Sequence, residues 1–150
     1  MMILKYMQKA LNEAKKAYLK GEIPVGCIIT ENDRIIASAH NTVIENSCCT
    51  CHAEINAIRE ATNALGVKEL AQCDMYVTLE PCPMCAGAIV NAKIKRLYIG
   101  APEPKSGCFG SVTDFNRLPF NHKPEVYHGI CEDESKKIMR DFFVNLRTPN

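Results

Sequence analysis

The sequence has little excess charge and no long hydrophobic run, and each absence excludes a class of protein. Its 18 basic and 17 acidic residues leave a formal net charge of +1, so any contact with RNA must use a local patch. No stretch approaches the roughly 18 apolar residues of a membrane-spanning helix. Charges such as Lys5, Lys9 and Glu13 interrupt the N-terminal segment, which excludes a signal peptide. We therefore expect a cytoplasmic protein.

Repeats, low-complexity tracts and linkers rich in proline or glycine are also lacking. With 150 residues, 47% of them apolar and 23% charged, the chain is expected to form a single domain over residues 1–150. Nine cysteines, by contrast, is a high number. A secreted chain of this size would suggest a disulfide framework, but an odd number without an export signal favours reduced thiols, some of them metal ligands.

Hydrophobic spacing and turn residues predict helices that alternate with strands after an initial helix and hairpin. The expected elements are a helix over 4–18, strands over 25–30 and 34–39, a helix over about 51–65, a strand over 75–79, a helix over 83–92, strands over 94–99 and near 126–127, and a helix over 132–147. This order predicts an α/β fold of three α/β/α layers, in which helices cover both faces of a mixed five-stranded sheet.

Two short motifs lie at the predicted starts of two helices. The first is His52-Ala-Glu54, and the second is Pro81-Cys-Pro-Met-Cys85. Unpaired amides and the helix dipole favour negative charge at such positions. Helix starts that follow strand ends are also where α/β folds place their sites. Each motif is weak alone, but together they indicate one functional site.

The chemistry of these residues suits a catalytic zinc ion. His52, Cys82 and Cys85 offer one nitrogen and two sulfur ligands, and three protein ligands leave a fourth position for water. Zinc lowers the pKa of such a water from about 15.7 to about 7. Glu54 can carry a proton from that water to a substrate ring and then to departing ammonia. The two motifs together match the signature of zinc-dependent base deaminases.

Simpler explanations exist for each residue taken singly. A structural zinc site would need a fourth ligand, which Cys48, Cys49 or Cys51 could supply, and the chain would then be a non-catalytic, zinc-stabilised RNA-binding domain. A lone histidine is more often a hydrogen-bonded residue than a ligand, and a glutamate in the first turn of a helix is usually a solvated one. The placement of ligand set and carboxylate at helix starts favours the catalytic interpretation.

Further stretches carry a family resemblance over most of the chain. They are GEIPVG at 21–26, AHN at 39–41, HAE at 52–54, YVTLEPCPMCAGAI at 76–89, NHKPEV at 121–126 and DFF at 141–143. From about residue 5 to residue 147 the sequence resembles the bacterial tRNA-specific adenosine deaminases of the cytidine-deaminase-like superfamily. The zinc motifs belong to the whole superfamily, whereas the first and last stretches separate this family from cytosine, cytidine and guanine deaminases.

The resemblance implies hydrolysis of adenosine to inosine at the wobble position, the first anticodon nucleotide, of an arginine tRNA. It also implies one Zn²⁺ per subunit and a homodimer that contacts the anticodon stem-loop near its subunit interface. Deamination of a free nucleobase or nucleoside (cytosine, guanine or cytidine) is the alternative within the same chemistry.

The resemblance also assigns residues to the substrate. Asn41 would hold the flipped base, and Glu22, Ile23 and Val25 would line its pocket, with Leu79 beside the metal site. An amide can pair with a purine edge because it carries both a donor and an acceptor.

Aromatic residues that could stack on RNA are Phe109, Phe142 and Phe143. Phe142 and Phe143 are neighbours on a predicted helix and cannot both face the core, so one is expected to be free for RNA.

The chain departs from the family pattern in two places. The residues CCTC at 48–51 replace the usual Asp-Pro-Thr-Ala before the histidine ligand, and small buried residues are the simplest interpretation of this change. Glu103 replaces the usual aspartate in a loop near the substrate backbone, where an extra methylene is expected to alter contacts with the sugar.

Overall fold

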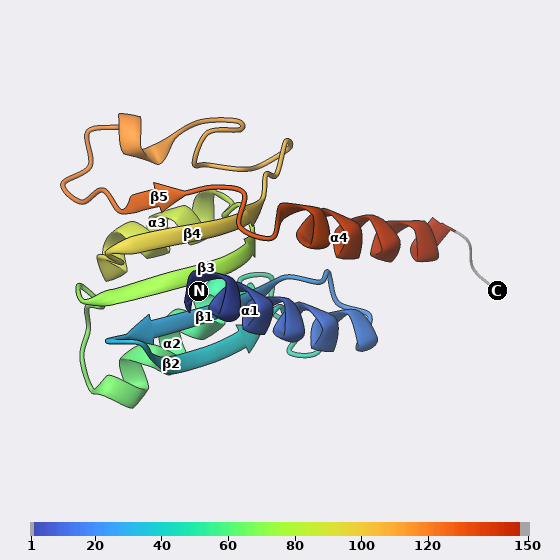
Figure 1. Cartoon of the computed structure of the whole chain (residues 1–150), viewed down its shortest axis with the longest axis horizontal. Helices are drawn as coiled ribbons and strands as arrows, with labels where there is room; N and C mark the ends of the chain where they lie inside the picture. The colour runs from blue at the N-terminus through green and yellow to red at the C-terminus, as the bar shows by residue number, and fades with distance from the viewer. Residues whose placement is uncertain (1, 148–150) are drawn as a thin grey trace.

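The computed structural model describes residues 2–147, which form a five-stranded sheet between two pairs of helices (Figure 1). In chain order the elements are α1 (Met2–Leu19), β1 (Gly26–Glu31), β2 (Arg34–His40), α2 (Ala53–Leu65), β3 (Cys73–Leu79), α3 (Pro83–Ala92), β4 (Arg96–Ala101), the 3₁₀ helix η1 (Phe115–Arg117), β5 (Glu125–Tyr127) and α4 (Glu132–Arg147). The predicted three-layer α/β/α fold with a mixed sheet is confirmed. None of the described helices is long and apolar enough to cross a membrane.

The sheet is mixed because a hairpin precedes the parallel strands. Its order is β2-β1-β3-β4-β5, in which β1 is antiparallel to β2 and β3, whereas β3, β4 and β5 run parallel. The hairpin turn at Asn32 and Asp33 has φ of 49° and 59°, the backbone that Asn and Asp tolerate best after glycine. Consequently β2 and β3 point the same way and end at the same edge of the sheet.

Most predicted boundaries are shifted by one or two residues, and two of the shifts have a clear local cause. Helix α2 begins at Ala53 rather than near residue 51, because His52 keeps an extended backbone and is the N-cap. Strand β4 begins at Arg96 rather than at residue 94. The reason is that Lys93 adopts the left-handed conformation at the end of α3, and the Ile94 amide still donates to the Ile89 carbonyl.

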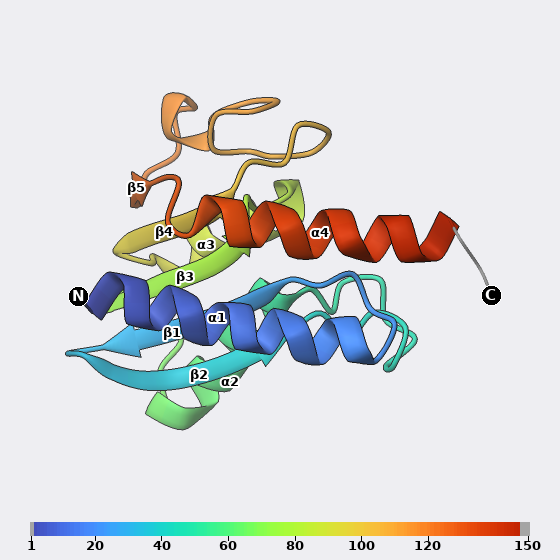
Figure 2. The same cartoon turned by 45° about the vertical axis from the view of Figure 1, so that its right-hand side comes forward.

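Helices α1 and α4 lie side by side on one face of the sheet (Figure 2). Tyr6, Met7 and Ala10 of α1 pack against Ile28 and other inward-facing residues of the central strands, and all are buried. Residues of this face alternate along each strand with residues of the opposite face, as strand geometry requires.

Helices α2 and α3 cover the other face. A larger core there joins Ala57 and Ala61 of α2 and Ile89 of α3 to Met75 and Ile99 of the sheet. Because β2 leads into α2 and β3 leads into α3, both helices begin at the same edge of the sheet. The fold therefore brings the two motifs together.

Candidate active site

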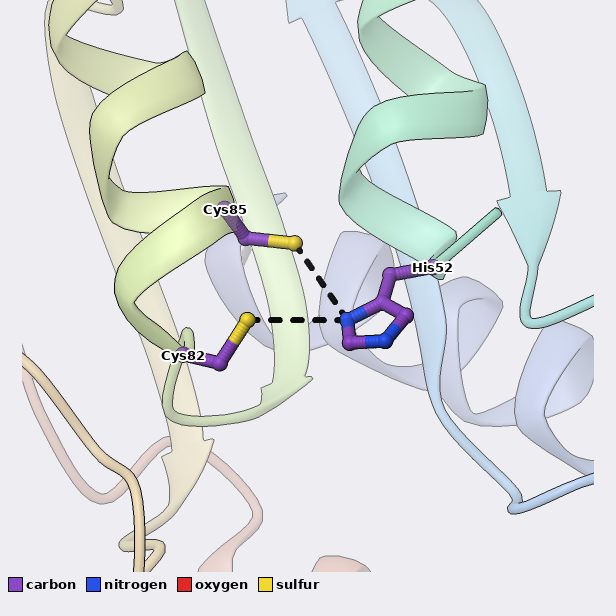
Figure 3. A group of neighbouring side chains, drawn as sticks. All are labelled: His52, Cys82 and Cys85. Atoms are coloured by element: carbon purple, nitrogen blue, oxygen red, sulfur yellow. Dashed lines mark hydrogen bonds between the residues drawn. The ribbon is translucent and has the colours of Figure 1, made fainter. Parts of the chain in front are cut away.

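The starts of α2 and α3 place His52, Cys82 and Cys85 around one point (Figure 3). His52 Nδ1 lies 3.6 Å from the Sγ atoms of both cysteines, and the three ligand atoms lie within 4.8 Å of one another. One nitrogen and two sulfurs at this spacing form a set that can hold a metal ion. Among residues 2–147, these three side chains are the group whose ligand atoms lie close enough together to hold a metal ion.

The local backbone explains why these side chains point inward. His52 and Cys82 are the N-caps of α2 and α3, with extended backbone (φ/ψ of −71°/158° and −74°/174°). Neither side chain caps its own helix, so both are free to face the site. Pro83 occupies the first turn of α3, where its fixed φ suits a helix start, and this places Cys85 within the same turn.

The two cysteines share one negative charge. Hydrogen bonds from Cys85 and His52 lower the pKa of Cys82 to about 4, so its sulfur is a thiolate at neutral pH. The pKa of Cys85 is raised, chiefly because its thiol donates to Cys82 and because it is buried. The hydrogen bond with Cys82 raises the pKa of His52. Such a set binds a divalent cation in its deprotonated form, so binding releases protons.

Glu54 is a buried carboxylate beside this group. Its side chain is 4% exposed, and it follows His52 by two residues in the first turn of α2. Burial raises the pKa of Glu54 to about 7, and the negative Cys82 contributes to the increase. A carboxyl group with a pKa near neutrality can both accept and donate a proton at neutral pH.

A cavity of about 390 Å³ opens over these residues, a size that suits a small ligand or a single base. Its lining includes His52, Glu54 and Cys82. Six residues that the sequence assigned to substrate also line it: Ile23, Val25, Asn41, Leu79, Glu103 and Phe143.

The structure places Glu22 away from a direct role in the cavity. Its carboxylate is 1% exposed and accepts hydrogen bonds from the backbone amides of Ile44 and Glu45, at 3.0 and 2.7 Å. Glu22 therefore anchors the loop that follows β2. The sequence predicted that Glu22 lines the pocket. Its hydrogen-bond partners could not be predicted, because they are more than 20 residues away and any residue type offers a backbone amide.

The three candidate aromatic residues occupy different environments. Phe143 is 38% exposed and lines the cavity. Phe142 is buried and packs edge-on against Tyr18, with ring centroids 5.8 Å apart. Phe109 is also buried, against Phe115, and cannot stack on RNA as proposed from the sequence. Phe143 is thus the one of the three that faces the site.

Asn41 is held firmly at the edge of the cavity. Its side-chain amide donates to the Ile23 carbonyl and accepts from the Val43 amide, both at 3.2 Å. Asn56 of α2 supports the same region, because its side chain donates to the carbonyls of His40 and Cys51. Asn56 thereby ties the end of β2 to the residue before His52, a role that sequence reasoning missed.

Several other lining residues were also missed from the sequence. Lys105 and Ser106 come from the loop after β4, and Met139 comes from α4. Met139 had a usable signal, because it lies four residues before Phe143 and so shares its helix face. The two loop residues had no comparable pattern.

Two of the three cysteines before His52 are joined. Cys48 and Cys51 form a disulfide with a Cα–Cα distance of 5.4 Å, so the expectation of reduced thiols is wrong for this pair. A tight turn, in which the Cys51 amide donates to the Cys48 carbonyl, brings them together. Cys51 is buried as the sequence predicted, but Cys48 is half-buried and Cys49 is exposed, so the interpretation as small buried residues holds for Cys51 alone. The disulfide leaves neither Cys48 nor Cys51 as a thiolate for a fourth metal ligand.

Comparison with known proteins agrees with this geometry. The MafB19-like deaminase family matches residues 1–147. A tRNA-specific adenosine deaminase of Rickettsia typhi is 44% identical over 145 residues, which cover 95% of this chain and 98% of that protein. The Bacillus subtilis protein of the same name is 44% identical over 143 residues, covering 95% and 89%. A solved structure from a study of A-to-I editing by tRNA:A34 deaminases at the wobble position superposes with a TM-score of 0.88 at 45% identity, over 89% of this chain and 98% of that one.

Proposed function

The chain belongs to the tRNA-specific adenosine deaminases, and from this premise we propose that it converts adenosine to inosine at the wobble position of a transfer RNA. The observation that carries the proposal is the buried Glu54 beside a histidine and two cysteines, in the lining of a cavity large enough for one base. The reaction is a hydrolysis, in which adenosine and water give inosine and ammonia.

We propose zinc as the cofactor, held by His52, Cys82 and Cys85. The donor set supports this choice, since one imidazole and two thiol sulfurs suit zinc, and the Cys82 sulfur is already a thiolate at neutral pH. When bound, zinc supplies the Lewis acidity that makes a water molecule nucleophilic at neutral pH. With three protein ligands, a bound zinc ion would keep a fourth position for water, as in catalytic rather than structural centres.

Glu54 moves the protons of the reaction. The attacking water adds to C6 of the adenine, and Glu54 accepts the proton that this water loses. The carboxyl group then donates this proton to the ring nitrogen N1. Glu54 next carries the second proton of the former water to the amino group, the bond between C6 and the amino nitrogen breaks, and ammonia leaves. A pKa of about 7 suits both halves of this exchange, because neither form of Glu54 is strongly favoured.

The cavity walls select a flipped base. Ile23, Val25 and Leu79 provide apolar contact. After its bonds to Ile23 and Val43, the Asn41 amide keeps one N–H and one oxygen lone pair that can meet a purine edge. A base must leave its stack to enter, and an anticodon loop opposes this less than a duplex does. Phe143, which is partly exposed at the cavity, is placed to stack on a neighbouring nucleotide.

We further propose that the substrate is an arginine tRNA, that the enzyme acts in the cytoplasm and that it works as a homodimer. The family resemblance of the sequence supports these three points. Sedimentation of the zinc-loaded protein tests the dimer: a mass of one subunit at micromolar concentration contradicts it. Editing of arginine tRNA compared with other tRNAs that carry a wobble adenosine tests the tRNA.

A substrate panel tests the proposed function. The zinc-loaded protein is mixed with an anticodon stem-loop that carries adenosine at the first anticodon position, with a matched stem-loop that carries adenosine only elsewhere in the loop, and with free adenosine, guanine, cytosine and cytidine. We expect inosine in the first stem-loop alone. Release of ammonia from a free base or nucleoside, without inosine in the stem-loop, would favour the alternative deaminase.

A further inference from the structure

A second buried carboxylate, Glu80, lies between the metal ligands and the loop after β4. It is 3% exposed, it directly follows Leu79 at the end of β3, and only Pro81 separates it from Cys82. Its own backbone amide donates to the Ala101 carbonyl at the end of β4, at 2.9 Å. Glu80 is therefore fixed to the sheet, which makes it a rigid support for anything its side chain holds.

Both oxygens of the Glu80 carboxylate accept hydrogen bonds from the loop after β4. Oε1 accepts the Glu103 amide at 3.1 Å and the Ser111 hydroxyl. Oε2 accepts the amides of Phe109 and Ser111, at 2.9 and 3.1 Å. Four donors from three loop residues thus converge on one carboxylate, and hydrogen bonds to a charged acceptor are among the strong ones.

Close packing accompanies these bonds. A Cβ added at Gly107 would lie 2.3 Å from Glu80 Cδ and 2.4 Å from Oε2, so the loop backbone rests directly against the carboxylate. Glycine is required there because no side chain fits between them. The loop has little freedom to move while the Glu80 carboxylate is in place.

The segment held in this way forms one side of the substrate cavity. Glu103, Lys105 and Ser106, which we call the loop wall, all line the cavity. The Glu80 bonds hold the loop wall at its first residue, Glu103, and hold the chain that follows it at residues 109 and 111. The carboxylate therefore determines where the loop wall stands relative to Asn41 and the apolar wall opposite.

We propose that Glu80 is a positioning residue for substrate selection, which holds the loop wall where it contacts the nucleotide that carries the reacting base. This inference rests on the proposed function. It assigns Glu80 no proton transfer, because both of its oxygens are occupied by loop donors. Its loss should weaken the capture of RNA more than it slows the chemical step.

The test is Glu80→Gln in the zinc-loaded protein. The amide keeps the shape of the side chain but offers one acceptor oxygen instead of two, so about half of the loop contacts are lost. We expect the half-saturating concentration of the stem-loop to rise roughly tenfold, as the loss of bonds to a charged group predicts. The single-turnover rate at saturating RNA should stay within about threefold of wild type. Hydrogen exchange of residues 103–111 should become faster.

Asp114→Asn is the matched control. Asp114 also accepts a backbone amide, that of Asn116 at 3.0 Å, but it caps the 3₁₀ helix η1 and does not hold the loop wall. The half-saturating concentration of the stem-loop should be unchanged in this variant. If Glu80→Gln fails to fold, Ser111→Ala removes one of the four bonds and should raise half-saturation by roughly threefold; no rise would then count against the proposal.

Two results overturn the inference. One is a Glu80→Gln protein with unchanged half-saturation and unchanged exchange in residues 103–111. The other is a tenfold or larger loss of the saturating rate without a change in half-saturation, which would place Glu80 in the chemistry. If the wild-type protein makes no inosine at all, the proposed function fails, whereas an active wild type with an unaffected variant contradicts only the role of Glu80.

Discussion

The buried carboxylates Glu22, Glu54 and Glu80 have different roles because their surroundings differ. At Glu54 the effect of burial outweighs the hydrogen bonds from the backbone and from Cys85, so its pKa is raised to about 7. Glu22 and Glu80 are as deeply buried, but each accepts two or more hydrogen bonds from loop atoms. The first environment suits proton transfer, and the second suits the fixing of a loop.

The pH dependence of stability distinguishes the second environment. Burial alone would raise the pKa of Glu80, but hydrogen bonds from Ser111, Phe109 and Glu103 lower it below the ordinary 4.5. Because the pKa of Glu80 is lower in the folded protein than in the unfolded chain, its charged form stabilises the fold above pH 4.5. This stabilisation is lost as the pH falls through the pKa of the folded state. The loss of unfolding free energy caused by Glu80→Gln should therefore shrink below pH 4.5 in urea titrations. A loss that is constant from neutral pH to acid would contradict this account.

At the scale of the elements, two adjacent residues of α4 have different environments, one in the core and one at the cavity. Phe142 is 6% exposed against Tyr18, whereas Phe143 is 38% exposed and lines the cavity with Met139. A helix turns by about 100° per residue, so neighbours necessarily face different surroundings.

The two phenylalanines should therefore respond differently to truncation. Phe142→Ala should lower the free energy of unfolding by about 3 kcal/mol, because it leaves a cavity in the packed interface. Phe143→Ala should change stability by less than about 1 kcal/mol. It should weaken stem-loop binding by about 1–3 kcal/mol, the usual contribution of one base stacked on an aromatic ring. Urea denaturation and RNA titration measure both; equal stability losses would contradict the assignment.

A second element-scale prediction concerns two glycines. A Cβ at Gly26 would lie 1.8 Å from the Ala10 carbonyl oxygen, so β1 and α1 touch at this point. Gly26→Ala should cost about 2 kcal/mol of stability through overpacking. Within the described chain a Cβ at Gly87 of α3 meets nothing within 4 Å, so Gly87→Ala should stabilise the helix by up to about 1 kcal/mol. Similar urea midpoints for the two variants would count against this difference.

The elements and the metal group could be predicted because their signals are local. Hydrophobic spacing indicated each α-helix and strand, although the short 3₁₀ helix η1 was not predicted. The positions of His52, Cys82 and Cys85 at helix starts indicated that they meet. The roles of Glu22, Glu80 and their loops could not be predicted in the same way. Their partners are backbone amides 22 to 31 residues away, and any residue type offers such an amide.

For the whole molecule, one bound ion should add a link between α2 and α3, which already meet through the core and through the contacts of His52 with Cys82 and Cys85. His52 stands on α2 and the two cysteines on α3, and both helices pack on the same face of the sheet. A ligand that binds only the folded state stabilises that state by mass action.

Zinc binding should therefore raise thermal stability. At a free zinc concentration 100-fold above Kd the folded state gains about 2.7 kcal/mol. For a domain of this size the midpoint of unfolding should rise by roughly 5–10 °C, and a chelator should reverse the rise. Cys82→Ser should abolish the effect, whereas Cys131→Ser, which changes a free cysteine outside the group, should retain it. Metal analysis should find one zinc per chain, and a shift that survives Cys82→Ser would contradict the ligand assignment.

The central claim is that Glu54 moves the protons of wobble-adenosine deamination. Its most direct test is a single-turnover assay of wild type and Glu54→Ala, both shown to carry equal zinc and to bind the anticodon stem-loop equally, with inosine as the readout. We predict inosine from the wild type and a rate at least about 100-fold lower from the variant, the usual contribution of a general acid and base. Comparable rates of inosine formation in the two proteins would contradict the claim.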